Sequence, residues 1–204
     1  MKLNAVFLAA VLAGAFTPAG AVDVVLGNVP QIDSNLVRNP CGLAPATGSG
    51  SPVLGCLNDN HAQLVQLSSD ESLEITGGQA SLDSTDGSFS QLTISLVANA
   101  LGTVILNIDA TEDGFVTFAD GSGIDGTFAL DGNGQNFFTA TGVTGGFLSF
   151  TTFNSQMAET DIVADVKQIR LGVVGAIPEP ETYALMLAGL GAIGFLTRRR
   201  KPRS

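Results

Sequence analysis

His61 is the one histidine of the chain, so a Ser-His-Asp triad or a Cys-His site would have to use it. No GxSxG elbow or similar nucleophile context accompanies it. Its neighbours Asn58, Asp59 and Asn60 are typical of a turn. Paired carboxylates could hydrolyse glycosides, but sugar clefts are normally lined by Trp or Tyr. The chain has no Trp, and its single Tyr, Tyr183, lies near the C-terminus. We therefore expect a protein that is not an enzyme.

Acidic and amide side chains in glycine-rich turns are the candidates for metal ligands. Asp131-x-Asn133-x-Gln135 resembles the start of a calcium loop, but Gly142 stands at the twelfth position, where such a loop has Glu. Asp is also a favoured turn former, and we prefer that explanation. Whether calcium binds is left open, and no other cofactor is predicted. The candidate ligands are Asp109, Glu112, Asp113, Asp131 and Asn133.

Cys41 and Cys56 are the two cysteines, too few with one His for a typical zinc site. An even cysteine count in an exported chain predicts a disulfide. The closed loop, rich in Gly, Ser and Pro, would hold no shape by itself. In the chain-entropy model a loop of this length gains about 3 kcal/mol of stability.

The charge of the chain is unevenly distributed. Residues 22–177 hold 17 acidic residues against three basic ones, a net −14, whereas the whole chain of 204 residues carries −10. Such a body repels phosphate, which excludes a general nucleic-acid binder, and it attracts divalent cations. Apolar residues make up 45% of the chain, which excludes a disordered charged tail protein.

The sequence pattern predicts that the segments positioning these side chains are β-strands. Leu92, Ile94 and Leu96 alternate with polar residues, and the same alternation predicts a strand over 104–110 and another over 167–173. Asp-Gly dipeptides, which mark hairpin turns, occur five times. We expect an all-β sandwich or barrel with eight to ten strands after the disulfide region.

The N-terminal segment 1–21 has the pattern typical of a secretory signal peptide. Lys2 precedes an apolar run from Ala5 to Phe16, and Ala19-Gly20-Ala21 has the small-x-small pattern of a cleavage site. The mature chain would then begin at Val22.

The C-terminal segment combines an apolar run with a basic cluster. Tyr183–Leu196 is short for a membrane span, but flanking residues extend it close to the minimum. The positive-inside rule keeps the cluster that follows it in the cytoplasm as a stop-transfer signal. Its residues are Arg198, Arg199, Arg200 and Lys201.

Pro178, Glu179 and Pro180 stand before this apolar run. Two prolines fix the backbone and remove hydrogen-bond donors, so the segment stays extended and unpaired, as a protease substrate must be. The order of Pro-Glu-Pro, Gly-rich hydrophobic helix and Arg cluster resembles the PEP-CTERM sorting signal. The resemblance implies an exosortase as processing partner in a Gram-negative bacterium. It also implies export through the secretion machinery, transient anchoring in the inner membrane, and sorting to the cell surface or matrix.

A second resemblance concerns the body. The run from Asn136 through Thr151 to Arg170 is similar to the final strands of β-sandwich domains common in PEP-CTERM proteins. It implies a jelly-roll-like sandwich and favours a sandwich over a barrel.

These expectations divide the chain into a signal peptide (1–21), a β-sandwich (22–177) and a sorting signal (178–204). They favour a non-enzymatic surface or matrix protein associated with exopolysaccharide. The alternative is a carbohydrate-binding module for surface glycans, with or without structural calcium.

Overall fold

A computed structural model describes residues 22–29, 32, 34–38, 41, 49–76, 81–174 and 190. The expected signal peptide, and all of the expected sorting signal except Leu190, lie outside the described residues. Within the described part, no helix has the length and apolar character needed to cross a membrane.

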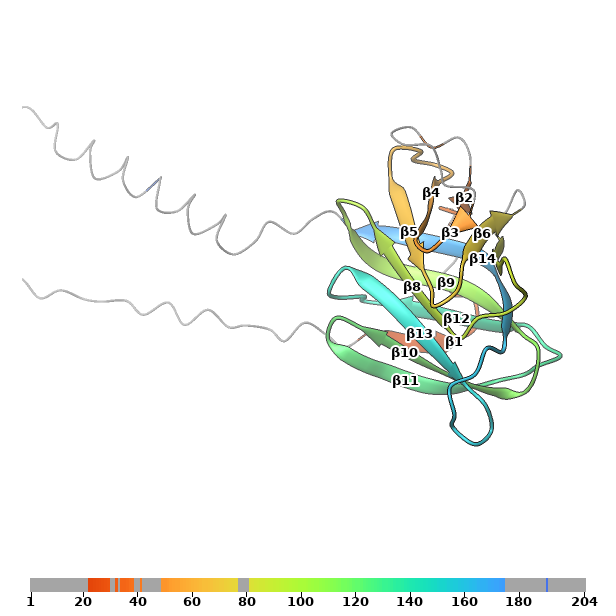
Figure 1. Ribbon diagram of the computed structural model, residues 1–204. Helices are drawn as coiled ribbons and strands as arrows, with labels where there is room; N and C mark the ends of the chain where they lie inside the picture. Colours follow the sequence, from red (N-terminus) through yellow and green to blue (C-terminus); the bar gives the residue numbers. More distant parts are fainter. Residues whose placement is uncertain are drawn as a thin grey trace, which may run out of the picture.

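The described body consists of two antiparallel seven-stranded sheets (Figure 1). Sheet A has the order β1 (Asp23–Leu26), β12 (Asn136–Thr141), β9 (Ala100–Ala110), β14 (Val163–Val174), β7 (Ser81–Ser84), β6 (Leu73–Thr76) and β3 (Ser49–Gly50). Sheet B has the order β11 (Gly123–Leu130), β10 (Gly114–Asp120), β13 (Phe147–Phe153), β8 (Gln91–Leu96), β5 (Leu64–Ser68), β4 (Val53–Leu57) and β2 (Leu36–Val37).

One hydrophobic core joins the two sheets. Phe118 of sheet B packs against Phe138 of sheet A with ring centroids 5.0 Å apart, and both are about 1% exposed. Phe118 also meets Phe150 edge-on at 5.9 Å. Such tilted ring pairs add to the burial energy. The all-β prediction is confirmed, and a shared core between two sheets is consistent with the expected sandwich. The jelly-roll likeness stays a prediction.

Strand β8 shows why alternating sequences form these sheets. Leu92, Ile94 and Leu96 are buried, while Thr93 and Ser95 face outward between them. This is the period of two that a sheet covered on one face requires. Ten described strands follow β4, within the expected range.

Strand β9 departs from the expected alternation. Ile105 and Asn107, placed by the sequence pattern on the outward face, are 0% and 1% exposed. The segment after β1 passes from one side of β9 to β14 on its other side: Leu171 N donates to Ser34 O at 2.9 Å, and the Ile32 side chain lies beside Gly172. The residue pattern of a strand does not reveal that another segment covers its outer face, so the sequence could not predict this burial.

The two ends of the described body lie at the same end of sheet A. Asp23 pairs with Thr141, Thr141 with Thr103, and Thr103 with Gly172, two residues before β14 ends. In Figure 1 the β14 arrow points to the left, and the β13–β14 loop lies at the lower right. We call the end with Asp23 and Val174 the tail end, and the other the loop end.

Candidate functional site

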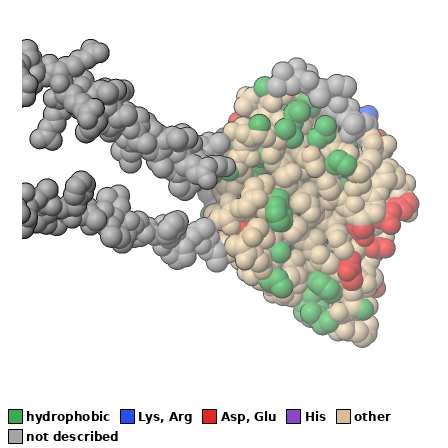
Figure 2. Space-filling view, turned by 60° about the vertical axis from the view of Figure 1, so that its left-hand side comes forward, with side chains coloured by type: hydrophobic (Ala, Val, Ile, Leu, Met, Phe, Trp, Pro, Cys, Tyr) green, Lys and Arg blue, Asp and Glu red, His purple; other side chains and the backbone are tan. Residues whose placement is uncertain are grey.

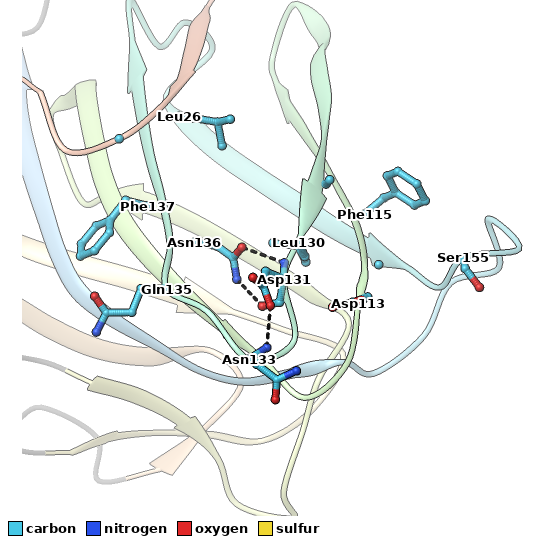
Figure 3. A pocket seen from close by; sticks show the side chains of 13 residues that line it. Leu26, Asp113, Phe115, Leu130, Asp131, Asn133, Gln135, Asn136, Phe137 and Ser155 are labelled. Carbon is cyan, nitrogen blue, oxygen red and sulfur yellow. Dashed lines mark hydrogen bonds between the residues drawn. The ribbon is translucent and has the colours of Figure 1, made fainter.

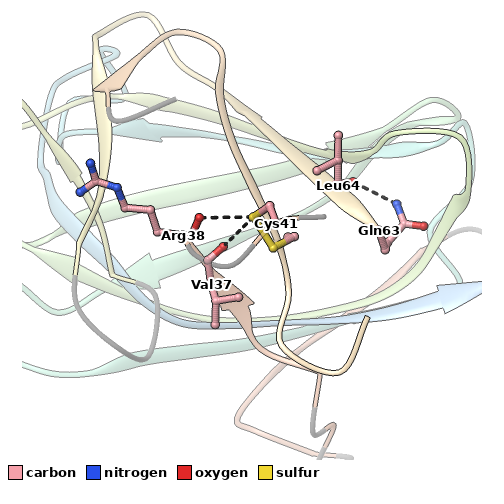
Figure 4. The surroundings of a disulfide bond; sticks show 6 residues. Val37, Arg38, Cys41, Gln63 and Leu64 are labelled. Atoms are coloured by element: carbon pink, nitrogen blue, oxygen red, sulfur yellow. Dashed lines mark hydrogen bonds between the residues drawn. A yellow bond between two sulfur atoms is a disulfide. The ribbon is translucent and has the colours of Figure 1, made fainter. Parts of the chain in front are cut away.

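The disulfide between Cys41 and Cys56 is present, as the sequence predicted. The two Cα atoms lie 5.5 Å apart, and Cys56 is fully buried in β4. Cys41 follows the two-residue edge strand β2, whose Val37 is the register partner of Cys56 (Figure 4). The cross-link therefore secures a strand too short to hold its place by pairing alone.

His61 lies exposed in the turn between β4 and β5, as its neighbours indicated. The adjacent side chains hold this turn to the segment before β2. Asn58 Oδ1 accepts from Asn35 N at 2.8 Å, and Asp59 Oδ2 accepts from Ser34 Oγ at 2.5 Å. These bonds give the turn a structural role.

The candidate calcium ligands divide into two places. Asp109 lies on the outer face of sheet A, where Lys167 Nζ donates to its Oδ2 at 2.7 Å. Asp113 and Asp131 lie together at the loop end, with Asn133 nearby and Glu112 exposed in the β9–β10 turn. Among the residues that the structure describes, no three His, Cys, Asp or Glu side chains are grouped so that they could hold a metal ion.

Asp109 belongs to a row of carboxylates that the sequence did not reveal. Glu74, Asp83, Asp165 and Asp109 are direct cross-strand partners on four neighbouring strands, from β6 to β9. Like charges placed directly opposite each other destabilise a sheet. Lys167 offsets this by binding both Asp109 and Asp165, the latter at 2.9 Å.

Hydrogen bonds from Lys167 to Asp109 and Asp165 raise the pKa of the ammonium well above its usual range. Burial raises the pKa of Asp165, and the bond from Lys167 opposes this without reversing it. At the far end of the row, Arg38 pairs with Glu74 at 3.6 Å. Two of the body's three cations are thus used to hold this face together.

Asp120 was also missed, because the sequence showed it only as part of an Asp-Gly turn. The residue is 5% exposed. It accepts from the backbone N–H and the hydroxyl of both Ser122 and Thr144, at 2.5–2.8 Å. Burial alone would raise the pKa of Asp120, but these hydrogen bonds outweigh it and lower the pKa to about 2. One side chain therefore joins two loops at the tail end.

A cleft of about 850 Å³ opens at the loop end (Figure 3). Leu26 at the end of the edge strand β1 and Gly27 after it contribute to the cleft, as do Ala129 and Leu130 at the end of the edge strand β11 and Asp131 after it. In Figure 3, Phe137 lies on one side and Phe115 on the other, with Asn136 and Asp131 between them. The cleft is therefore formed where the edges of the two sheets meet the β11–β12 loop.

The loop end is strongly acidic. Acidic side chains dominate the charged surface in Figure 2 and gather at its right-hand side. Hydrogen bonds tie the acidic loops to one another: Ser90 Oγ donates to Asp70 at 2.7 Å and to Glu159 at 3.1 Å. The loops 69–72, 85–88, 111–113, 131–135 and 154–162 hold eight carboxylates and no Lys or Arg: Asp70, Glu71, Asp86, Glu112, Asp113, Asp131, Glu159 and Asp161.

Comparison with protein families gives one match, to the PEP-CTERM protein-sorting motif, over residues 176–201. The match covers the Pro178-Glu179-Pro180 element, the apolar run and the basic cluster. It confirms the resemblance of the C-terminal segment. Such a motif implies export and exosortase-mediated sorting to the cell surface in Gram-negative bacteria. No curated protein and no solved structure matches the chain.

Proposed function

We propose that the chain is a non-enzymatic surface or extracellular-matrix protein, associated with exopolysaccharide and delivered by exosortase processing of its C-terminal segment. The observation that carries the proposal is the sorting motif at residues 176–201. In this proposal the signal peptide 1–21 directs export, and the C-terminal helix anchors the chain transiently in the inner membrane. The exosortase then acts near Pro178, Glu179 and Pro180 and removes the helix with Arg198, Arg199, Arg200 and Lys201.

The geometry of the body suits a chain that is held by its C-terminal segment. Strand β14 ends at Val174, two residues before the matched motif begins, and it ends at the tail end. The acidic loops and the cleft lie at the opposite end. A body held by its C-terminus therefore presents the loop end away from its point of attachment.

The test is the intact mass and cell fraction of the protein in an exosortase-bearing host. We expect the wild type to lose its C-terminal segment and to leave the cell. The double variant Pro178→Ala/Pro180→Ala should keep the segment and stay in the inner membrane. Pro202→Ala is the matched control, because it removes a nearby proline beyond the matched motif, and it should be processed normally.

Retention of the full tail by the wild type would contradict exosortase processing. The chain would then be a single-span membrane protein that displays a periplasmic β domain. Equal processing of the Pro178→Ala/Pro180→Ala variant would contradict the role given to the two prolines.

The second candidate function is a carbohydrate-binding module, with or without structural calcium. The cleft at the loop end favours it, because concave sites with a few polar groups are the usual place for small ligands.

A further inference from the structure

We propose that the cleft at the loop end binds a short neutral stretch of a polysaccharide chain. This inference rests on the proposed function, because it names the site and the ligand class through which the body would meet exopolysaccharide. A cleft of about 850 Å³ has the size of a typical ligand site. It is open to solvent at an end of the molecule that no described strand covers.

The cleft has an apolar side that suits a sugar ring. Leu26 is 67% exposed, and it lines the cleft together with Ala129 and Leu130. Its backbone partner in β12 is Phe138, a core residue, so the exposure arises because β1 is an edge strand. The C–H face of a sugar ring would remove this surface from water, at about 25 cal/mol per Å² buried.

The polar side of the cleft is rich in hydrogen-bond acceptors. Asp113 Oδ1 accepts from Gly132 N at 2.9 Å, and Asp131 Oδ1 accepts from Asn133 N at 2.8 Å. Within the described residues, the second oxygen of each carboxylate accepts no hydrogen bond, and the side-chain amides of Asn133 and Gln135 form none. Neighbouring sugar hydroxyls both donate and accept, so they match a carboxylate beside an amide.

The charge of the cleft selects against acidic sugars. Its lining contains Asp113 and Asp131 and no Lys, Arg or His. Six further carboxylates stand on the loops of the same end. A uronate, sulfate or phosphate group would meet repulsion without a compensating cation. A neutral saccharide carries no such penalty.

The backbone of the loop that carries these polar groups is held in place before any ligand arrives. Asn136 Oδ1 accepts from Asp131 N at 2.9 Å, and Asn136 Nδ2 donates to the carbonyls of Ile108 and Asp131, each at 3.0 Å. A Cβ added to Gly132 would lie 2.4 Å from backbone atoms of Glu112, so the two loops touch backbone to backbone. A fixed backbone loses little entropy on binding, which favours affinity.

The experiment uses the protein purified from the exosortase-bearing host, from the medium if it is processed and from the membrane fraction if it is not. Neutral oligosaccharides (cellohexaose, maltohexaose and mannohexaose) are titrated into ¹⁵N-labelled protein, with oligogalacturonate as the anionic counterpart. We expect at least one neutral oligosaccharide to shift the side-chain amide signals of Asn133 and Gln135. Oligogalacturonate should shift neither.

The double variant Asn133→Ala/Gln135→Ala should weaken that binding at least tenfold while the melting temperature stays unchanged, because both side chains are exposed and make no bond in the fold. Asn60→Ala is the matched control: it removes an exposed amide at the tail end and should bind as the wild type does.

Absence of binding by all neutral probes would overturn the inference, and so would binding that the double variant retains. Stronger binding of oligogalacturonate than of every neutral probe would overturn it too. None of these results alters the mass and localisation test. A failure of the binding proposal can therefore be told apart from a failure of the sorting proposal. Conversely, an unprocessed protein that still binds through Asn133 would uphold the cleft and remove the sorting step.

Discussion

Asp120 and Thr144 stand 24 residues apart in the chain and meet at the tail end. Both the backbone N–H and the hydroxyl of Thr144 donate to Asp120 Oδ2, at 2.8 and 2.5 Å. Asp120 closes the β10–β11 turn, and Thr144 lies in the β12–β13 loop. The pair therefore ties an edge hairpin of sheet B to the loop by which the chain crosses from sheet A to sheet B.

Asp120→Ala should lower the free energy of unfolding by about 2 kcal/mol at neutral pH, because it removes a buried carboxylate that accepts four hydrogen bonds. Urea denaturation measures the loss. Asp23→Ala is the control, because Asp23 is exposed and should change stability by less than about 0.5 kcal/mol. Equal midpoints for the two variants would contradict the role of Asp120.

The stabilisation by Asp120 should also depend on pH. Its pKa is about 2 in the folded protein and near 3.8 in a free chain. The folded pKa is the lower one, so the contribution is fully present above about pH 4 and is lost as the pH falls toward 2. The difference in unfolding free energy between wild type and Asp120→Asn should shrink across this window. A difference that stayed constant from pH 5 to pH 2 would rule out the carboxylate's charge as its source.

Lys167→Met should destabilise the protein by about 1 kcal/mol, because Asp109 and Asp165 would face each other without a cation. This expected loss of stability is modest because the Lys167 side chain is 42% exposed. High salt should reduce the loss, since added ions screen the remaining repulsion. Arg38→Met removes a longer and equally exposed pair and should cost less. Equal losses for the two variants would contradict the bridging role of Lys167.

Cys41→Ala/Cys56→Ala should lower the free energy of unfolding by about 3 kcal/mol, the value expected for a loop of this length. The same urea experiment on the wild type, with and without a thiol reductant, supplies the comparison. Reductant should move the wild type toward the double variant and leave the double variant unmoved. A wild type indifferent to reductant would mean that the cross-link contributes nothing.

Calcium should leave the melting temperature unchanged relative to a chelator. In the part of the chain that the structure describes, no three acidic, His or Cys side chains are grouped to hold a metal ion, and Asp109 is bound to Lys167. A ligand that binds the native state must raise the melting temperature. A rise in millimolar calcium that disappears in Asp113→Asn/Asp131→Asn would instead establish the calcium site.

The sequence was most informative where a single local rule applies. Alternation identified β8, and Asp-Gly identified the turns at Asp86, Asp113, Asp120 and Asp131. The fifth Asp-Gly, at Asp125, lies inside β11 beside an irregularity in its pairing with β10, because Gly126 with φ of 157° suits a bulge as well as a turn. Local chemistry does not distinguish the two.

Features that depend on residues far apart in the chain could not be predicted from the sequence. The carboxylate row needs the registers of four strands, and a slip of one residue would move a whole strand's side chains to the other face. Asp120 needs Thr144, and the burial of Ile105 needs the segment after β1. The cleft needs two edge strands from different sheets. None of these leaves a period or a motif in the chain.

The position of β14 has a mechanical consequence. It is the longest described strand, it lies between β9 and β7, and its last residue, Val174, leads directly into the C-terminal segment. A pull on that segment runs along the strand axis, while the ladder bonds to β9 lie across it. Those bonds are loaded together in shear and cannot be peeled open one at a time. If a ligand holds the body at its loop end while force is applied at its C-terminus, the hydrogen bonds of the central strand β14 should therefore make the body resist forced unfolding.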